Sequence, residues 1–238
     1  LIIGSASETQ RVKNRYRLPE AKFARIFNPL DTELWQPDER DETREALGLS
    51  ASQTVAVWHG RIDLHIKGLD VLIHSWRHVV ERAAALRPHL LLVGDGADRG
   101  PLSTLLKRLP HGTWTWIDEY VSDRTLLRRY LSAGDLAVLA SRREGFPVAP
   151  LEAMSCGLPL VATCVAGTHE IVSDGLRVGG VIVPTDDVKA LADALVQLIC
   201  DPGYRNDLAQ NARPLITDRV SYPMVGKELA RFLGLTGE

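Results

Sequence analysis

From residue 55 onward, short apolar runs alternate with longer segments in which apolar residues recur at helical spacing. Short apolar runs bounded by turn residues are typical of buried strands. We therefore expect strands at residues 55–59, 89–93, 113–117, 136–140, 158–163 and 180–184. Strands that alternate with helices predict an α/β fold with a doubly wound, Rossmann-like parallel sheet.

The segments between these runs predict helices, and two of them begin at an aspartate that can cap the first turn. Asp123 precedes one of these helices, and Asp186 or Asp187 precedes the other. The expected helices are residues 41–48, 68–86, 101–109, 123–132, 148–156, 167–173, 186–199, 204–216 and 223–233.

The first forty residues follow a different pattern. Residues 1–3 predict a strand, residues 9–16 a short helix, and residues 23–27 a second apolar run. Asn28-Pro29 marks a turn, and we place a linker near residues 28–40. The chain begins at Leu1 as though in the middle of a strand, so we expect a piece of a longer polypeptide.

Composition excludes several classes of protein. The chain has 238 residues, 45% of them hydrophobic, which suits a soluble globular protein with a sizeable core. Its formal net charge of -2 predicts no nucleic-acid partner. Three cysteines are too few and too scattered for a disulfide framework or a zinc site, so we expect buried thiols in a reducing compartment. No metal and no cofactor is expected.

Candidate chemistry centres on residues 141–153, between the strand at 136–140 and the helix at 148–156. A turn of this kind opens at the carboxyl end of a parallel sheet, where α/β folds bind ligands. Pro147 suits the start of a helix, because the amides of the first turn have no helical partner. The amides near Val148 and Ala149 then face an anion such as a phosphate.

Two carboxylates, Glu144 and Glu152, bracket this turn with seven residues between them. They could serve as the acid and base of a glycosidase. They could equally bind hydroxyl groups, since a carboxylate accepts two hydrogen bonds from a vicinal diol. A third interpretation is a solvated cluster in which Glu144 pairs with Arg142 and Arg143.

A second candidate site follows the strand at 55–59. Arg61 offers a planar fork for phosphate oxygens and Lys67 a mobile charge, so the pair could grip a diphosphate. The alternative is two surface cations near a helix start. His59 lies near Arg61 and could touch the same ligand, a role we rank low. The glycines from Gly94 to Gly100 fit a dinucleotide motif poorly. They more simply let the backbone pass close to a ligand or turn tightly.

These residues match a family. The segments G-R-I-D-x-x-x-K-G-L-D-V-L-I, L-L-L-V-G-D-G and S-R-R-E-G-F-P-V-A-P-L-E-A resemble the donor domain of retaining GT-B glycosyltransferases. The most similar group is the fourth glycosyltransferase family, known as glycosyl transferases group one. The likeness runs from about Asn28 to about Leu198, and its most specific element is the E-x7-E motif that contains E-G-F-P.

The resemblance implies a division of the chain and a role for each matched residue. Residues 1–30 are expected to be the remnant of an N-terminal acceptor domain and its hinge, and residues 31–238 the nucleotide-sugar donor-binding domain, the C-terminal half of a GT-B fold. Arg61, Lys67 and Glu144 match catalytic positions: the first two hold the donor diphosphate, and the third faces the sugar hydroxyls. The matched donor-binding residues are Gly60, Gly94, Gly145, Phe146, Pro147, Val148, Ala149 and Glu152, of which Glu152 binds the ribose diol.

By resemblance, the function is transfer of a sugar from a nucleotide-diphosphate donor, such as a UDP-sugar, to an acceptor sugar or lipid-linked glycan held by the missing domain. This hexosyltransferase-type activity would be absent from the fragment alone. The alternatives are a GT-B epimerase or phosphorylase, and a nucleotide-binding module. We expect a cytoplasmic location, with attachment to the inner membrane face through the missing domain as a second option.

Overall fold

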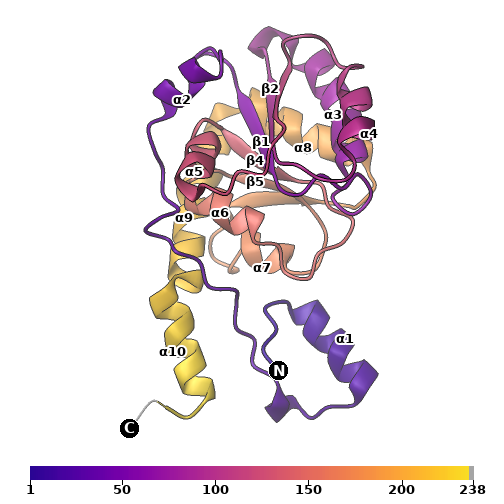
Figure 1. Ribbon diagram of the computed structural model, residues 1–238. Coiled ribbons are helices and arrows are strands. Elements are labelled where there is room, and N and C mark those ends of the chain that lie inside the picture. Colours follow the sequence, from indigo (N-terminus) through magenta and orange to yellow (C-terminus); the bar gives the residue numbers. More distant parts are fainter. Residues whose placement is uncertain (236–238) are drawn as a thin grey trace.

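The computed structural model describes residues 1–235, and its centre is one sheet of six parallel strands in the order β3-β2-β1-β4-β5-β6 (Figure 1). All six expected strands are present, and the predicted α/β fold is confirmed. The strands are β1 (Val55–His59), β2 (His89–Val93), β3 (Trp114–Ile117), β4 (Leu136–Leu139), β5 (Leu160–Thr163) and β6 (Gly180–Val183).

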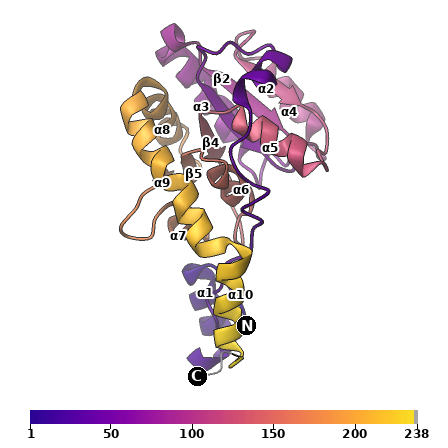
Figure 2. The same cartoon turned by 90° about the vertical axis from the view of Figure 1, so that its left-hand side faces the viewer.

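Helices cover both faces of the sheet (Figure 2). Alternate residues of each strand point to opposite faces. Ala56 and Trp58 of β1 pack in one core, and Val55 and Val57 pack in the other. The first core includes α3 (Leu69–Arg82), α4 (Arg99–Leu106) and α8 (Val188–Cys200). The second includes α5 (Arg124–Ser132), α6 (Ala149–Ser155), α7 (Thr168–Val172) and α9 (Pro202–Val220).

The predicted caps are confirmed, and the helix ends differ by a few residues. The Asp123 side chain accepts hydrogen bonds from the amides of Thr125 and Leu126, and Asp187 accepts one from Ala190. The helix α9 is longer than expected at both ends, because Asp201 caps it early and it runs on to Val220. The remaining helices are α2 (Arg40–Ala46), α10 (Tyr222–Phe232) and two short 3-10 helices, η1 (Glu20–Lys22) and η2 (Ala84–Leu86).

Residues 1–27 form a small N-terminal lobe below the sheet (Figure 1). Its helix α1 (Ala6–Tyr16) begins earlier than expected, because Ser5 caps it. The strand predicted at residues 1–3 is wrong. Ile2 makes a single parallel bridge with Ala24, with no third strand beside it, and its side chain stays 52% exposed.

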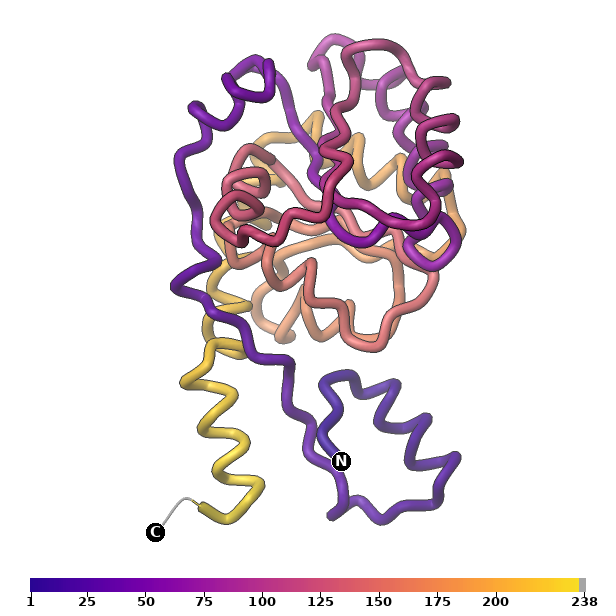
Figure 3. The backbone as a smooth tube through the Cα atoms, viewed as in Figure 1, coloured from indigo at the N-terminus to yellow at the C-terminus, as the bar shows by residue number. Residues whose placement is uncertain are grey.

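Residues 28–39 connect this lobe to α2 and pass beside α9, with a turn at residues 32–34 (Figure 3). The amide of Leu30 donates to the carbonyl of Val220 at 2.8 Å. Arg213 of α9 donates to the carbonyls of Thr32 and Trp35 at 3.1 and 2.8 Å. Residues 30–35 of the predicted linker are therefore pinned to α9, while Asp38 pairs with Arg128 of α5.

Only one of the three cysteines is buried. Cys156 is buried, as expected. The expectation is wrong for Cys164, which directly follows β5, and for Cys200, the last residue of α8, because both are exposed. Among residues 1–235, no helix has the length and apolar character needed to cross a bilayer. Residues 236–238 of the predicted donor domain lie outside the described residues.

Candidate functional site

The loops that follow β1 and β2 touch one another at the carboxyl edge of the sheet. The amide of Gly60 donates to the carbonyl of Val93 at 3.0 Å. Gly94 has φ +146°, and a Cβ atom there would lie 1.9 Å from the carbonyl oxygen of Gly60. A Cβ at Gly96 would lie 2.1 Å from the carbonyl oxygen of Ile62. The glycines after β2 thus let this loop approach the loop after β1 closely. That they also bring the backbone close to a ligand stays a prediction.

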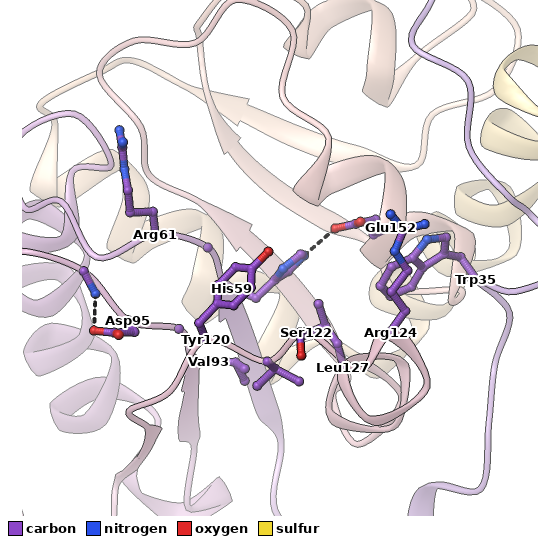
Figure 4. Close-up of a pocket in the computed structure, with 14 residues that line it drawn as sticks. Trp35, His59, Arg61, Val93, Asp95, Tyr120, Ser122, Arg124, Leu127 and Glu152 are labelled. Carbon is purple, nitrogen blue, oxygen red and sulfur yellow. Dashed lines mark hydrogen bonds and ion pairs between the residues drawn. The ribbon is translucent and has the colours of Figure 1, made fainter.

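A cavity of about 500 Å³ lies beside these loops, and we call it the Glu152 cavity (Figure 4). Its walls include Gly60, Arg61, Gly94 and Glu152, which are four of the residues that the sequence predicted for the site. Tyr120 also lines the cavity. Sequence reasoning missed Trp35, Ser122 and Arg124, because none of them belongs to a pattern with chemical meaning.

Glu152 is largely buried, with 18% of its side chain exposed. Burial raises the pKa of Glu152 to about 7. His59, at the end of β1, lies beside it, and Figure 4 shows the imidazole pointing toward the carboxylate. The imidazole Nε2 lies 3.1 Å from the carbonyl oxygen of Ala149 and 3.5 Å from Oε2 of Glu152. Burial and the nearby Lys67 lower the pKa of His59 to about 4.

A second cavity, of about 670 Å³, contains Glu144, and we call it the Glu144 cavity. Lys67 Nζ lies 2.8 Å from Oε1 of Glu144, and Ser141 Oγ donates to the same oxygen at 2.7 Å. The interpretation of Glu144 as a partner of Arg142 is wrong, because Arg142 instead pairs with Asp70 and Asp186. Lys67 and Glu144 hold each other at the cavity wall.

Arg61 lines both cavities, so they meet at this side chain. The Arg61 side chain is 67% exposed, and its only neighbour of opposite charge within the described residues is Asp63, at 3.7 Å. Glu8 and Arg11 of α1 also line the Glu144 cavity, a contribution that sequence reasoning missed. The N-terminal lobe therefore forms part of one cavity wall.

The turn between the two glutamates begins at Gly145, which lines the Glu144 cavity. The ring of Phe146 stacks on Phe27, with centroids 5.2 Å apart. Pro147 is buried, Val148 is the cap residue with 41% of its surface exposed, and Ala149 begins α6. The helix predicted at residues 148–156 is confirmed, one residue shorter at each end. The prediction that these residues contact a sugar nucleotide stays a prediction.

Among residues 1–235, no group of three or more His, Cys, Asp or Glu side chains is placed to hold a metal ion. The chemistry of the two cavities is that of carboxylates, guanidinium and ammonium groups, and backbone amides. Such groups bind hydroxyls and phosphates. A ligand that carries hydroxyl groups at both ends and a diphosphate between them fits this order of groups.

A family model described as "Glycosyl transferases group 1" matches residues 53–201, more than half of the chain. The chain is 32% identical over 187 residues to the lipopolysaccharide core biosynthesis mannosyltransferase LpsB of Rhizobium meliloti, covering 74% of this chain and 50% of that protein. It is 30% identical over 220 residues to a D-inositol 3-phosphate glycosyltransferase of Saccharomonospora viridis, covering 90% and 50%. The chain spans about half the length of the curated relatives it matches.

Solved structures share the fold. The Anabaena protein HepE in complex with UDP has a TM-score of 0.83 at 22% identity, covering 99% of this chain and 63% of that one. The C-terminal domain of a glycosyl transferase group 1 family protein from Francisella tularensis has a TM-score of 0.70 at 22% identity, covering 81% and 99%. The expected likeness to the C-terminal half of a GT-B fold is confirmed.

Proposed function

The chain belongs to the glycosyl transferases group 1 family, and we propose that it is the donor-binding part of a retaining glycosyltransferase that uses a nucleotide-diphosphate sugar. One observation carries the proposal: two carboxylates lie in adjoining cavities, and a solvent-facing arginine stands where the cavities meet. The nucleoside would occupy the Glu152 cavity, the diphosphate would pass Arg61, and the sugar would reach the Glu144 cavity.

In this arrangement Glu152 accepts hydrogen bonds from the ribose diol, and Glu144 accepts them from the donor sugar. Lys67 already contacts Oε1 of Glu144, so it stands between the sugar and the diphosphate. Arg61 and Lys67 would stabilise the charge that develops on the departing diphosphate. Preorganised groups of this kind are usually the largest catalytic contribution, and loss of one costs on the order of 3 kcal/mol in other enzymes.

The rest of the proposal concerns the longer protein. We propose that residues 1–30 are the end of an acceptor domain and its hinge, and that the acceptor is a sugar or lipid-linked glycan. Two features support this division: the chain spans about half of its relatives, and α1 lines the Glu144 cavity. Transfer of a hexosyl group would then need the longer polypeptide, while nucleotide binding would not.

The two carboxylates give a test that needs binding alone. We expect Glu152→Gln to weaken binding of a nucleoside diphosphate by about tenfold or more, because a hydrogen bond to a charged group contributes roughly 1.5–3 kcal/mol. Glu144→Gln should leave that affinity unchanged and weaken only the sugar conjugate. The measurement is a pair of calorimetric titrations on each variant, using UDP with UDP-glucose and GDP with GDP-mannose.

Each variant is the control for the other, because both replace one cavity carboxylate by an amide. If the two variants lose both ligands equally, the assignment of nucleoside and sugar to separate cavities is wrong. If neither nucleotide pair binds the wild-type chain, the proposed function itself is wrong.

A further inference from the structure

The proposed function gives no role to His59, the last residue of β1. Its side chain is only 9% exposed, yet it lines the Glu152 cavity. A buried imidazole at a cavity wall can either fill space in the core or take part in ligand binding. The contacts of its Nε2 atom favour a part in ligand binding.

The Nε2 atom faces two oxygen atoms of α6. It lies 3.1 Å from the carbonyl oxygen of Ala149 and 3.5 Å from Oε2 of Glu152. A carbonyl oxygen only accepts hydrogen bonds, so Nε2 carries the proton and donates. Ala149 and Glu152 are three residues apart on the helix and therefore lie on one face. The N–H group thus bonds the start of α6 to the end of β1, and it holds the imidazole edge within 3.5 Å of the carboxylate.

The contact between His59 and Glu152 is not a pair of full charges. Burial and Lys67 lower the pKa of His59 to about 4, so the imidazole is neutral near pH 7. Arg124, at the start of α5, is the cation whose charge acts on Glu152. Lys67 pairs with Glu144 instead. The imidazole therefore restricts the orientation of the Glu152 carboxylate and adds no net charge beside it.

A fixed direction matters for a ligand with two adjacent hydroxyl groups. An ionised carboxylate has about four acceptor positions, and two of them on different oxygens must face a diol together. A contact on Oε2 limits rotation of the carboxylate plane, which would otherwise lose the paired geometry. A site built to bind a hydroxyl group rejects an analogue that lacks it far more strongly than an apolar pocket does.

We propose that His59 is a positioning residue that makes the Glu152 cavity selective for ribonucleoside over 2′-deoxyribonucleoside diphosphates. It does so by holding the Glu152 carboxylate in the orientation that accepts both the 2′- and the 3′-hydroxyl group. This inference rests on the proposed function, in which Glu152 binds the ribose.

The test compares ribo- and deoxyribonucleotides on three proteins. The probes are UDP, GDP and ADP, each with its 2′-deoxy counterpart, and the tightest pair is carried forward. His59→Phe keeps a ring of similar size without a donor, and His59→Gln keeps an N–H group close to the Nε2 position. Thermal unfolding of each variant reports on the fold. Should His59→Phe not fold, His59→Asn replaces it, because its shorter amide does not reach that position.

We expect the wild type to prefer the ribonucleotide by about tenfold or more, the effect of one hydrogen bond to a charged group. His59→Phe should bind the ribonucleotide about tenfold more weakly, keep its affinity for the deoxyribonucleotide, and lose the preference. His59→Gln should retain the preference.

Three results would overturn the inference. A wild-type preference that persists in His59→Phe removes the positioning role, and an equal loss of both ligands assigns His59 to packing. A loss of preference in His59→Gln as large as in His59→Phe shows that the N–H group is not what matters. If the wild type binds the ribonucleotide and the deoxyribonucleotide equally well, Glu152 does not bind the 2′-hydroxyl group. In that case the proposed function is wrong at this residue, independently of His59.

Discussion

Glu152 meets two opposing demands. A carboxylate must be ionised to accept two hydrogen bonds from a diol, but its burial disfavours the ionised form. Burial raises the pKa of Glu152 to about 7, and the neutral imidazole of His59 does little to offset this. The same side chain therefore makes both ligand binding and folding depend on pH.

Nucleotide affinity should fall as the pH is lowered from 8 to 6, because protonation of Glu152 turns one of its acceptor oxygens into a donor. With a pKa of about 7, the wild type should lose most of the ionised form across this range. Titration of the tightest-binding nucleoside diphosphate at several pH values measures it. Glu152→Gln is the control, and its affinity should vary much less; an equal decline in both proteins would contradict the role of Glu152.

Stability should show the opposite trend. The unfolded carboxyl group has a pKa of 4.5 and the folded one about 7, so the folded state binds more protons between these values. Wild-type stability therefore falls as the pH rises through this window. Glu152→Gln should be the more stable protein at pH 8, by on the order of 3 kcal/mol, and lose that advantage at pH 4. Urea unfolding at the two pH values measures it, and an advantage that does not change with pH would contradict the assignment.

At the scale of single residues, the sequence predicted which residues belong to the site better than it predicted what surrounds each of them. The spacing of Glu144 and Glu152 predicted that both lie beside one turn, and the structure places them in two adjoining cavities. Arg61 lines both cavities but is distant in sequence from the two glutamates, so no local pattern predicts where its side chain points. The burial of His59 likewise depends on α6, ninety residues later in the chain.

At the scale of elements, α7 is tied to the turn between the two glutamates. Gly167 caps α7 with φ +88°, and a Cβ atom there would lie 2.6 Å from the ring of Phe146. Phe146 in turn stacks on Phe27, and Arg219 of α9 lies over the Phe27 ring at 4.6 Å. Four separate segments thus meet at one aromatic pair beside the Glu144 cavity.

Gly167→Ala should destabilise the protein more than Gly112→Ala. Gly112 has a similar φ of +77° but nothing within 4 Å of a Cβ atom, so both variants carry the same backbone cost of about 1–2 kcal/mol. Only Gly167→Ala adds a clash with Phe146, worth about 1–3 kcal/mol. Chemical denaturation of the two variants measures the difference, and equal losses would show that Phe146 moves aside without cost.

The sequence predicted the strands of the sheet closely, but it was wrong at residues 1–3 and underestimated the length of α9. β1 and β2 are continuous apolar runs buried on both faces, so their ends coincide with the ends of the pattern. At residues 1–3 the same kind of run forms only one bridge, because a strand needs partners that a local pattern does not reveal. The earlier start of α9 came from a cap at Asp201, and its later end at Val220 came with the bridge between Leu30 and Ser221, which no local pattern shows.

At the scale of the whole molecule, Arg213 joins parts of the chain that are far apart in sequence. It donates to the carbonyls of Thr32, Trp35 and Ser155, and its bond to Trp35 spans 178 residues. Contacts of this range leave no periodic signal in a sequence. For the same reason, alternation of strands and helices predicted a parallel sheet without predicting that β1 lies beside β4.

Arg213→Met should lower the free energy of unfolding by about 3 kcal/mol, because it leaves several carbonyl groups without the charged donor that pairs with them. Arg205→Met is the matched control on the same helix. Arg205 donates to Leu198 and Ile199, only a few residues earlier in the chain, so its loss should cost about 1 kcal/mol. Urea unfolding measures both, and similar losses would show that the link to residues 32–35 adds no stability.

The strand order β3-β2-β1-β4-β5-β6 also has a consequence for how the chain is assembled during synthesis. Strands β1, β2 and β3 are neighbours in the sheet and consecutive along the chain, so half of the sheet can pair before β4 leaves the ribosome. The strand β4 must then dock on the open side of β1, not on β3, the strand made just before it. Leu30 and Trp35 precede all six strands of the sheet in the chain, and they find their partners in α9 only after the sixth strand has been made. Because contacts of such long range form slowly, closure of residues 30–35 onto α9 is the step at which folding of this sheet waits for α9 to be synthesised.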